Sequence, residues 1–482
     1  MSRSLGARTA VALALALRVL GATGVAAAQS TPAAATPKAL SVEEAVASGL
    51  AAAPSLLSAT LDARAAKFRE ADARYRMLPS LAVSAGYTQL SVEPLPSLSG
   101  VPLPQSVEQY LYENSGLVDS LLQELSAPTS EKDLRVDLQY PVFAGFRLRE
   151  AAEIAKYQAL GKAAAAELAR RALVFEIRRA YWEAVRARSN VDALRKALDL
   201  ESVMKDEVAG LSAQGMASGA DKLGEEARFD QATLALDEAL AGKDLASLVL
   251  SSLVGDTDSR SVAVVEYALV SVPGASPPPG GLSDSDLVDA GLRALVEKAL
   301  ANRPETRAAS MVLSAAAASR AAAKGELYPS LSVVGSISYA DPDPRIFPAV
   351  DVFNLSWSIG ARLRYDIGAV PGAIERGKAA EADLGKARAD LERQRDAIAL
   401  DLRKCALALR RARDSLMLTR SMVGQAEEAR RVAEAKFENG LAKRSEVLQS
   451  EMALLRSNIA VENRLIDVEI AGADLLRAGA LE

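Results

Sequence analysis

Charged residues in two alternating segments are the first candidates for chemistry in this sequence. Arg135 and Asp137 alternate with apolar neighbours between residues 133 and 140. A similar alternation between residues 355 and 367 carries Arg362, Arg364 and Asp366. Alternation places the charges on one face of a strand and the apolar side chains on the other. Such a face suits a water-filled lumen, where we expect these residues to pair across strands rather than bind a specific solute.

Catalysis finds no support in the residue types. The chain has no histidine, which excludes His-dependent triads and histidine metal ligands. Its single cysteine, Cys405, lies in a helical pattern and is expected to be packed or at the surface. Gly280 and Gly281 lie in a linker rather than after a strand, so they do not indicate a phosphate-binding loop. We therefore expect no enzymatic activity, no cofactor and no metal site.

The chain contains one structural unit twice. Four pairs of residues mark the repeat: Pro54 and Pro304, Pro79 and Pro329, Tyr140 and Tyr365, and Gly215 and Gly440. The first two pairs are 250 residues apart and the last two are 225 residues apart. A fixed internal offset indicates a duplicated unit. The change of offset places 25 extra residues between Pro79 and Tyr140 of the first copy.

Each copy is expected to run helix, strand, strand, helix, helix, which makes the fold mainly α. The first helix should run from Ser41, a candidate N-cap, to about Met77, because Pro79 disfavours helical geometry in the residue before it. Strands with one apolar face are expected at residues 81–88, 133–140, 331–339 and 355–367. Very long helices should follow at residues 147–212 and 373–438, and each should turn at Gly215 or Gly440 into a returning helix. Apolar residues seven apart, such as Leu168, Phe175 and Trp182, indicate coiled-coil packing.

Composition and termini indicate an exported protein. The chain has 482 residues with a net charge of −5, which argues against a nucleic-acid partner. Residues 1–28 read as a signal peptide, with an early basic start, an apolar stretch and an Ala-x-Ala cleavage site. A linker at 29–40 precedes the first repeat, 41–254, and a Pro/Gly-rich linker at 255–286, with a candidate strand at 262–272, precedes the second, 287–482. Downstream of the signal no run of 18 apolar residues predicts a membrane-spanning helix.

The apolar strand faces allow two interpretations. A sheet of a soluble protein could bury them against helices. A lipid-facing barrel is favoured by aromatic residues near the strand ends, namely Tyr87, Tyr140, Tyr339, Trp357 and Tyr365. Four strands cannot close a barrel in lipid without leaving backbone groups unpaired, so the chain would have to oligomerise. Two chains would give a barrel nearly filled by side chains, whereas three would give twelve strands and a lumen.

The order of elements resembles that of the TolC family of outer-membrane efflux channels. The resemblance covers essentially the whole mature chain and includes the Leu-Pro-Ser-Leu segment at 78–81 and a turn motif at 214–223 that recurs at 439–448. It implies a homotrimer with a 12-stranded transmembrane β-barrel and an α-helical coiled-coil barrel that projects into the periplasm. It also implies passive conduction of substrates from an inner-membrane pump, with a periplasmic adaptor protein docking at the hairpin tips.

The same resemblance assigns roles to the two turns. Asp221 and Glu446 would line the closed periplasmic entrance as a gate, although Gln449 and Gly224 stand where the family can place a second acid. The alternative, which is compatible with a gate, is that Asp221 and Glu446 are acids that complement the N-terminal dipoles of helices. Residues at the tips are the adaptor-docking candidates: Gly215, Met216, Ala217, Gly440, Leu441 and Ala442.

A rival interpretation is a periplasmic coiled-coil adaptor or scaffold without a membrane pore. Such a protein would share the export signal and the long antiparallel hairpins. An adaptor would be expected to contain one hairpin flanked by small β domains, whereas this sequence predicts two hairpins.

Overall fold

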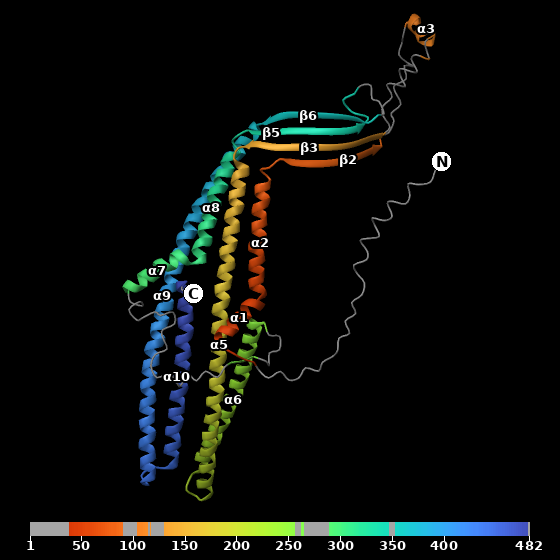
Figure 1. Cartoon of the computed structure of the whole chain (residues 1–482). Coiled ribbons are helices and arrows are strands. Elements are labelled where there is room, and N and C mark those ends of the chain that lie inside the picture. The colour runs from red at the N-terminus through yellow and green to blue at the C-terminus, as the bar shows by residue number, and fades with distance from the viewer. Residues whose placement is uncertain are drawn as a thin grey trace, which may run out of the picture.

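The computed structural model describes residues 38–89, 104–113, 116, 130–255, 262–264, 289–346 and 352–480. The expected signal peptide and most of the first strand connection and of the 255–286 linker lie outside these residues. The long helices run together and end in turns at one end of the molecule (Figure 1). The four-stranded sheet leaves the opposite end (Figure 1).

The elements follow the duplicated order. The first copy consists of α1 (Val42–Ala52), α2 (Pro54–Tyr75), β2 (Ser80–Gln89), β3 (Ser130–Ala144), α5 (Arg147–Ala213) and α6 (Gly219–Val254), with α3 (Gln105–Glu113) between the strands. The second consists of α7 (Asp289–Asn302), α8 (Pro304–Gly325), β5 (Ser330–Asp341), β6 (Asn354–Arg364), a 3₁₀ turn (Ile367–Ala369), α9 (Val370–Glu438) and α10 (Arg444–Gly479). Outside the repeats, β1 (Lys38–Leu40) pairs in parallel with β4 (Val262–Val264). The candidate strand at 262–272 is thus confirmed for its first three residues, and the rest lies outside the described part of the chain.

The expected single helix from Ser41 to Met77 is wrong, because it is broken at Ala53. Ser41 does cap α1, with its side chain and that of Glu44 bonded reciprocally to backbone N–H groups. Ala53 then adopts an extended conformation, and Pro54 begins α2 at a bend of 51°. Proline has no N–H and disfavours helical geometry in the residue before it, but it fits the first turn of a new helix. Arg303 and Pro304 repeat this break in the second copy.

The sheet has the order β2-β3-β5-β6 and is antiparallel throughout. Its two hairpins have the same register once the repeat offsets are applied. Val83 lies opposite Val136, and the corresponding residues Val333 and Ala361 also lie opposite each other. The two copies therefore pair their strands in equivalent registers.

Two apolar cores are related by the same offset. Ile177 and Leu250 are fully buried in the first core. Leu402 and Leu475, each 225 residues later, are fully buried in the second. Each core lies where a long helix, its returning helix and a short helix, α1 or α7, meet. Burial of these stripes holds each hairpin together, and the first core also includes Ile466 of α10 from the second copy.

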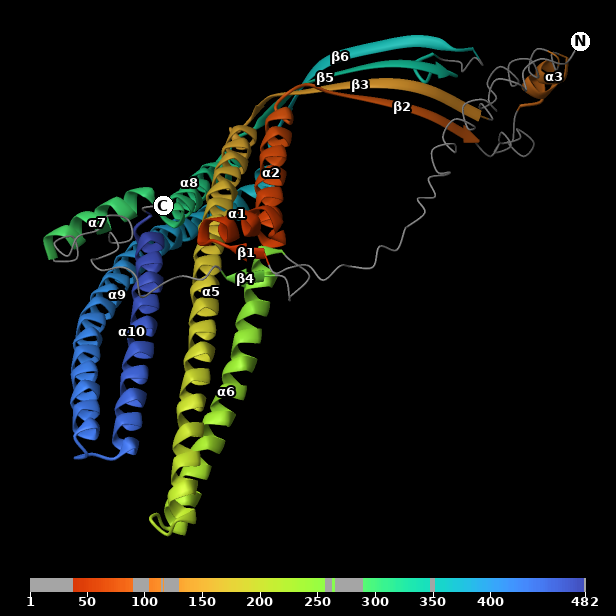
Figure 2. The ribbon, with the colours of Figure 1, turned by 60° about the horizontal axis from the view of Figure 1, so that its bottom comes forward.

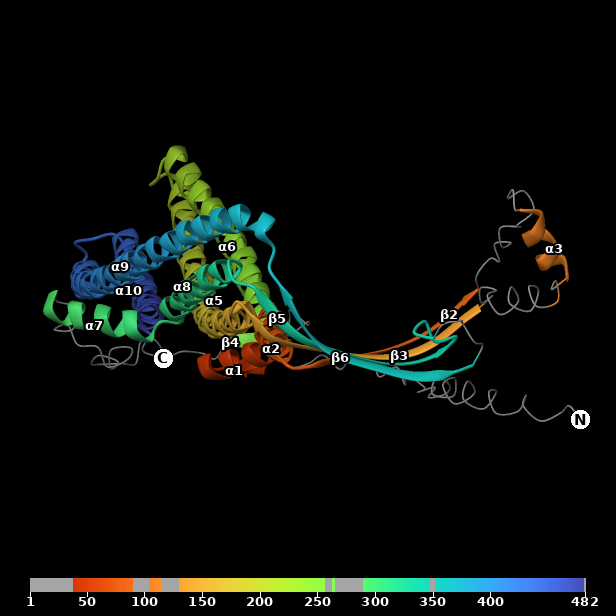
Figure 3. The same ribbon diagram turned by 90° about the horizontal axis from the view of Figure 1, so that it is seen from above.

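The helices form a layer whose lateral order matches that of the sheet. Nearer the sheet, neighbouring helices are α2, α5, α8 and α9 in that order, and nearer the turns they are α6, α5, α10 and α9. Figure 2 shows the two hairpins, α5/α6 and α9/α10, ending in the same direction. Seen from above, the curved sheet extends away from the helices (Figure 3). First-copy elements thus lie along one lateral edge of the chain and second-copy elements along the other.

Among the described residues, no single helix is long and apolar enough to cross a membrane. By length and composition alone, the bent pair α1 and α2 passes that test when taken together.

Candidate functional site

The apolar face of the sheet is open. Val83, Trp357 and Leu363 have exposed fractions of 71%, 69% and 69%. The opposite face is also exposed along β2, so no helix of the described chain covers this strand on either side. An uncovered apolar face of this size marks an interaction with another apolar phase. The expectation of a soluble sheet packed against its own helices is therefore not met.

The polar face carries four of the five expected charges, and they do not pair within the chain. Arg135 and Asp137 lie on β3, and Arg362 and Arg364 lie on β6. None of them forms an ion pair with a described residue. The expected cross-strand pairing is therefore absent from the single chain.

Asp366 does not belong to this face, so its assignment to a strand is wrong. β6 ends at Arg364, and Asp366 begins the 3₁₀ turn by accepting a hydrogen bond from the backbone N–H of Ala369 at 3.3 Å. Aspartate favours such local side-chain-to-backbone bonds, which compete with strand pairing.

The sheet ends laterally in two unpaired edges. β2 pairs only with β3, and β6 pairs only with β5, in the part of the chain that the structure describes. Each edge presents a row of backbone N–H and C=O groups that need a partner strand, most of all in lipid.

The two hairpin turns have the same backbone geometry. Gly215 and Gly440 adopt left-handed conformations, with φ of 74° and 70°, directly after the ends of α5 and α9. The next N–H, from Met216 or Leu441, reaches back to the carbonyl of Leu211 or Lys436 at 2.8 Å. This pattern closes a helix C-terminus and requires a residue that tolerates positive φ, which confirms the expected role of the two glycines.

The tips present small apolar knobs to solvent. Met216 and Leu441 have exposed fractions of 64% and 79%. Ala217 and Ala442 beside them are half-buried. The six residues of the two turns thus form two exposed patches at the same end of the chain.

Asp221 and Glu446, which correspond in the repeat, differ in what their carboxylates do. Asp221 accepts hydrogen bonds from the hydroxyl and the backbone N–H of Ser218, at 2.7 and 3.0 Å. These bonds, the hydroxyl first, hold the pKa of the Asp221 carboxyl below its usual range. Glu446 is exposed in the first turn of α10, whose N-cap residue Lys443 makes no side-chain cap. Asp221 is thus a helix cap, and Glu446 has a free carboxylate.

A polar seam joins the two hairpins. Arg186 of α5 contacts Asp467 of α10 at 2.6 Å, and Asn463 of α10 donates to Asn190 of α5 at 3.4 Å. Beside these polar contacts, Ile466 of α10 is fully buried in the first apolar core. The junction between the hairpins therefore combines polar pairs with buried apolar packing.

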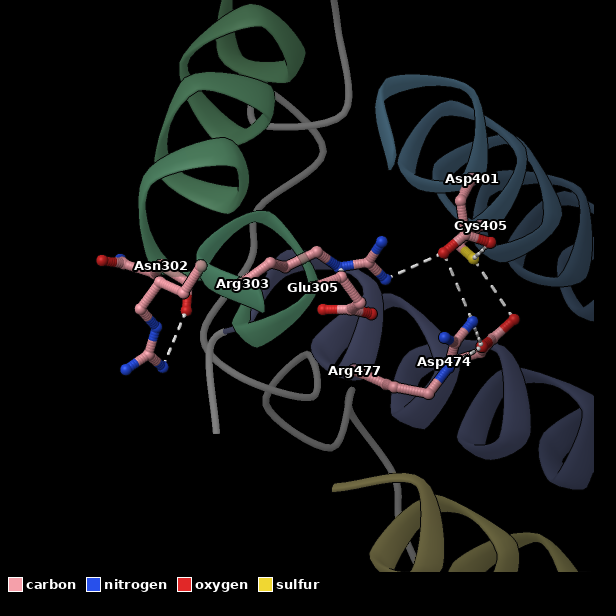
Figure 4. Close-up of polar contacts among 8 residues, drawn as sticks. Asn302, Arg303, Glu305, Asp401, Cys405, Asp474 and Arg477 are labelled. Atoms are coloured by element: carbon pink, nitrogen blue, oxygen red, sulfur yellow. Dashed lines mark hydrogen bonds and ion pairs between the residues drawn. The ribbon is translucent and has the colours of Figure 1, made fainter. Parts of the chain in front are cut away.

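An ionic cluster around one buried arginine lies at the root of the second hairpin and was not predicted from the sequence (Figure 4). Arg303 lies 2.8 Å from Asp401 of α9, and Arg477 of α10 lies 2.7 Å from Asp474 and 3.5 Å from Asp401. Only 4% of the Arg303 side chain is exposed. The signal in the sequence was an arginine before Pro304, where the first copy has an alanine before Pro54.

Cys405 belongs to the same cluster. It is buried, which agrees with the packed placement and not with the surface placement expected from the sequence. Its thiol donates to Oδ2 of Asp474 at 3.2 Å. Burial, together with the nearby Asp474 carboxylate, raises the pKa of the thiol to about 12. Such a thiol is a packed structural group rather than a nucleophile.

Comparison with known proteins covers both sequence and structure. Residues 295–478 match the family described as "Outer membrane efflux protein". No curated protein sequence matches the chain.

Solved structures share the fold over both copies. The outer membrane protein VceC of Vibrio cholerae is 18% identical with a TM-score of 0.70, over 91% of this chain and 95% of that one. The CmeC outer membrane channel of Campylobacter jejuni is 14% identical with a TM-score of 0.73, over 91% and 85%. A membrane protein from Pseudomonas aeruginosa is 22% identical with a TM-score of 0.70, over 93% and 97%. The second repeat of the chain thus matches the outer membrane efflux protein family, and both repeats share their fold with solved outer-membrane channel proteins.

Proposed function

We propose that three copies of this chain close side by side into one conduit, a 12-stranded β-barrel continued by an α-helical barrel. The single observation that carries this proposal is the pair of unpaired strands, β2 and β6, at opposite edges of a sheet with an uncovered apolar face. Head-to-tail pairing of β6 with β2 of the next chain satisfies both edges, and a ring leaves no edge at all. Four strands from each of three chains give a barrel wide enough for a lumen.

The lateral helices support the same closure. α2 exposes a stripe of apolar residues spaced by four and then seven positions: Leu57, Leu61, Phe68 and Tyr75. At the opposite lateral edge, α9 exposes Leu400, Leu407, Leu418 and Met422. Heptad-spaced apolar stripes are the contacts that neighbouring helices use in coiled coils. Closure of the ring would therefore have two effects. It would bury apolar surface between the helices of neighbouring chains, and it would pair the sheet edges in lipid.

The barrel would be anchored in the outer membrane, with the helices in the periplasm. The uncovered apolar face would contact lipid, and the face with Arg135, Asp137, Arg362 and Arg364 would line the aqueous lumen. The chain is a non-enzymatic transport protein, so conduction would be passive and the energy would come from an inner-membrane pump.

The hairpin tips would receive a periplasmic adaptor protein. The exposed knobs at Met216 and Leu441 suit packing against a partner's hairpin, and both tips end in the same direction. When the adaptor docks, α9 and α10 would shift against α5 through exchange of the polar pairs between the hairpins, with Ile466 of α10 as the apolar pivot. Of Asp221 and Glu446, Glu446 is the stronger gate candidate because its carboxylate is free. Asp221 instead caps the N-terminus of α6.

The alternative of a periplasmic adaptor or scaffold has no specific observation in its favour. The chain carries two hairpins of matched length, since α6 and α10 each have 36 residues. It also carries an uncovered sheet that a scaffold would leave exposed to water.

The oligomer and the pore are tested together on the purified protein. Native mass measurement in detergent should give a trimer, and the protein should form stepwise conductances in planar bilayers. A protein that stays monomeric and gives no conductance would sink the proposal. For docking, a photo-crosslinker at Met216→Cys or Leu441→Cys should capture a periplasmic partner, whereas one at the exposed Glu43→Cys on α1 should not.

A further inference from the structure

The duplication gives the pairing between neighbouring chains in atomic detail. Within the chain, the second strand of copy one (β3) pairs with the first strand of copy two (β5). In a ring, the second strand of copy two (β6) must pair with the first strand of copy one (β2) of the next chain. These two junctions are equivalent by the repeat, because the registers inside both copies already agree under the 250 and 225 offsets.

The observed register between β3 and β5 can therefore be transferred. Asp137 lies opposite Ser336, and Leu138 lies opposite Gly335. The β6 residue that corresponds to a β3 residue lies 225 positions later, and the β2 residue that corresponds to a β5 residue lies 250 positions earlier. The transferred register therefore places Arg362 opposite Gly86 and Leu363 opposite Ala85. Both transferred pairs keep the faces consistent, since Arg362 and Gly86 lie on the polar face while Leu363 and Ala85 lie on the apolar face.

Gly86 leaves space for a carboxylate on this polar face. It lies opposite Asp133 of β3, and a β-carbon on residue 86 would collide with Oδ1 of Asp133. The Asp133 carboxylate thus leans across β2 toward the free edge of the sheet. In the second copy, the equivalent residues Ser336 and Ser358 satisfy each other with a hydrogen bond of 2.8 Å.

Two opposite charges are left without partners in this row. Neither Asp133 nor Arg362 has an ion pair or a side-chain hydrogen bond with any described residue. We infer that Arg362 of one chain reaches over Gly86 of the next chain and pairs with Asp133 of that chain. The two α-carbons would be two strand spacings apart, about 10 Å. The lean of Asp133 and the length of an arginine side chain together can span that gap.

This pair rests on the ring closure proposed above and identifies its register. A one-residue slip would move every apolar side chain of the edge strand to the lumen face. A two-residue slip preserves the faces, so the hydrophobic pattern cannot exclude it. A slip that brings Arg364 opposite Gly86 would offer Asp133 that arginine in place of Arg362. The register transferred from the repeat selects Arg362, and the identity of the arginine that pairs with Asp133 therefore reports the register.

Cysteine crosslinking tests the register. In a Cys405→Ala background, Leu363→Cys combined with Ala85→Cys should give oxidised dimers and trimers on denaturing gels. Opposite pairs alternate between wide and narrow spacing from one residue to the next, so the adjacent pair, Arg364→Cys with Ser84→Cys, is made as the second variant. At least one of the two should crosslink. The matched control is Leu363→Cys with Val83→Cys, displaced by two residues, which should crosslink at least tenfold less.

Charge exchange tests the ion pair itself. Arg362→Asp and Asp133→Arg alone should each lower the trimer fraction in detergent severalfold, and the double variant should restore most of it. The control exchange, Arg364→Asp with Asp137→Arg, should show no such rescue. Trimers that crosslink only in the displaced register, or a double variant no better than the singles, would overturn the pair while leaving the ring intact. Chains that remain monomeric without any substitution would overturn the ring as well.

Discussion

Arg303 and Asp401 form an ion pair that joins the break between α7 and α8 to the middle of α9. Nη2 of Arg303 lies 2.8 Å from Oδ2 of Asp401, and the arginine side chain is 4% exposed. The corresponding residues of the first copy are Ala53 and Glu176, so the first copy lacks this pair. The second hairpin therefore has a charged anchor at its root in addition to its apolar core.

We expect Arg303→Ala to destabilise the protein by about 2–4 kcal/mol, because it leaves a carboxylate in a partly buried site without its main partner. The matched control is Arg307→Ala, four residues further along the same segment. Arg307 pairs with Glu167 at 2.7 Å but is half exposed, so its loss should cost less than about 1 kcal/mol. Urea unfolding followed by the helical circular dichroism signal measures both. An equal loss of unfolding free energy in the two variants would show that Arg303 does not anchor the second hairpin.

Cys405 should be inert toward alkylating reagents in the folded protein. Its thiol pKa of about 12 leaves only about one thiolate in ten thousand at pH 8, and the group is buried. Maleimide labelling should be negligible at pH 8 and complete after denaturation. A Met216→Cys variant supplies the control within the same chain, because its exposed tip should label within minutes. Rapid labelling of Cys405 in the native protein would contradict the packing at this cluster.

The long elements were predictable from the sequence because each has a strong local signal. α5 was expected at 147–212 and is observed at Arg147–Ala213, between a strand with clear alternation and the glycine turn at 215. Gly215 and Gly440 were expected after helix ends and have positive φ there. In such segments propensity, periodicity and turn chemistry all agree.

Other features depended on contacts that no local pattern contains. The helical pattern continues on both sides of Ala53, so the local sequence predicts one uninterrupted helix across the break before Pro54. Asp366 continues an alternating pattern in the sequence. In the structure its side chain accepts a hydrogen bond from the backbone N–H of Ala369, and this local turn replaces strand pairing. The Arg303 cluster unites residues from three distant segments, which only the fold brings together.

The first turn of α6 in the first hairpin should become less stable at acid pH. The Ser218 bonds lower the folded-state pKa of Asp221 below its unfolded value. Their contribution is therefore fully present above the unfolded pKa, near 4, and is lost as the pH falls through the lower folded value. The protection of amides in the first turn of α6, measured as the exchange rate relative to the intrinsic rate at the same pH, should fall over that acid range in the wild type. Ser218→Ala should raise the exchange rate at pH 7 and flatten the pH dependence, and an unchanged profile would contradict the cap.

The orientation of the sheet is tested by neighbouring residues on opposite faces of β6. Trp357 lies on the apolar face, and Ser358 lies on the polar face. Arginine on the lipid face of a barrel costs about 2–4 kcal/mol at mid-membrane depth and less near the interfaces. We expect Trp357→Arg to reduce the heat-stable, membrane-inserted fraction strongly, whereas Ser358→Arg should insert normally. The reverse order would mean that the apolar face is turned to the lumen.

Glu446 should control ion selectivity more than its repeat counterpart Asp221. Both acids stand three residues after a helix N-cap, but the Asp221 carboxylate is held by Ser218 while the Glu446 carboxylate is exposed. One Glu446 from each of three chains would give a ring of carboxylates that favours cations and that divalent cations can bridge. Glu446→Gln should therefore lower the cation-to-anion permeability ratio in planar bilayers and weaken divalent block. Asp221→Asn, which keeps size and much of the hydrogen bonding, should change neither property by more than about a third of the Glu446→Gln effect. Equal effects of the two variants would mean that both carboxylates face the pore, and an effect of Asp221→Asn alone would exclude Glu446 as the gate.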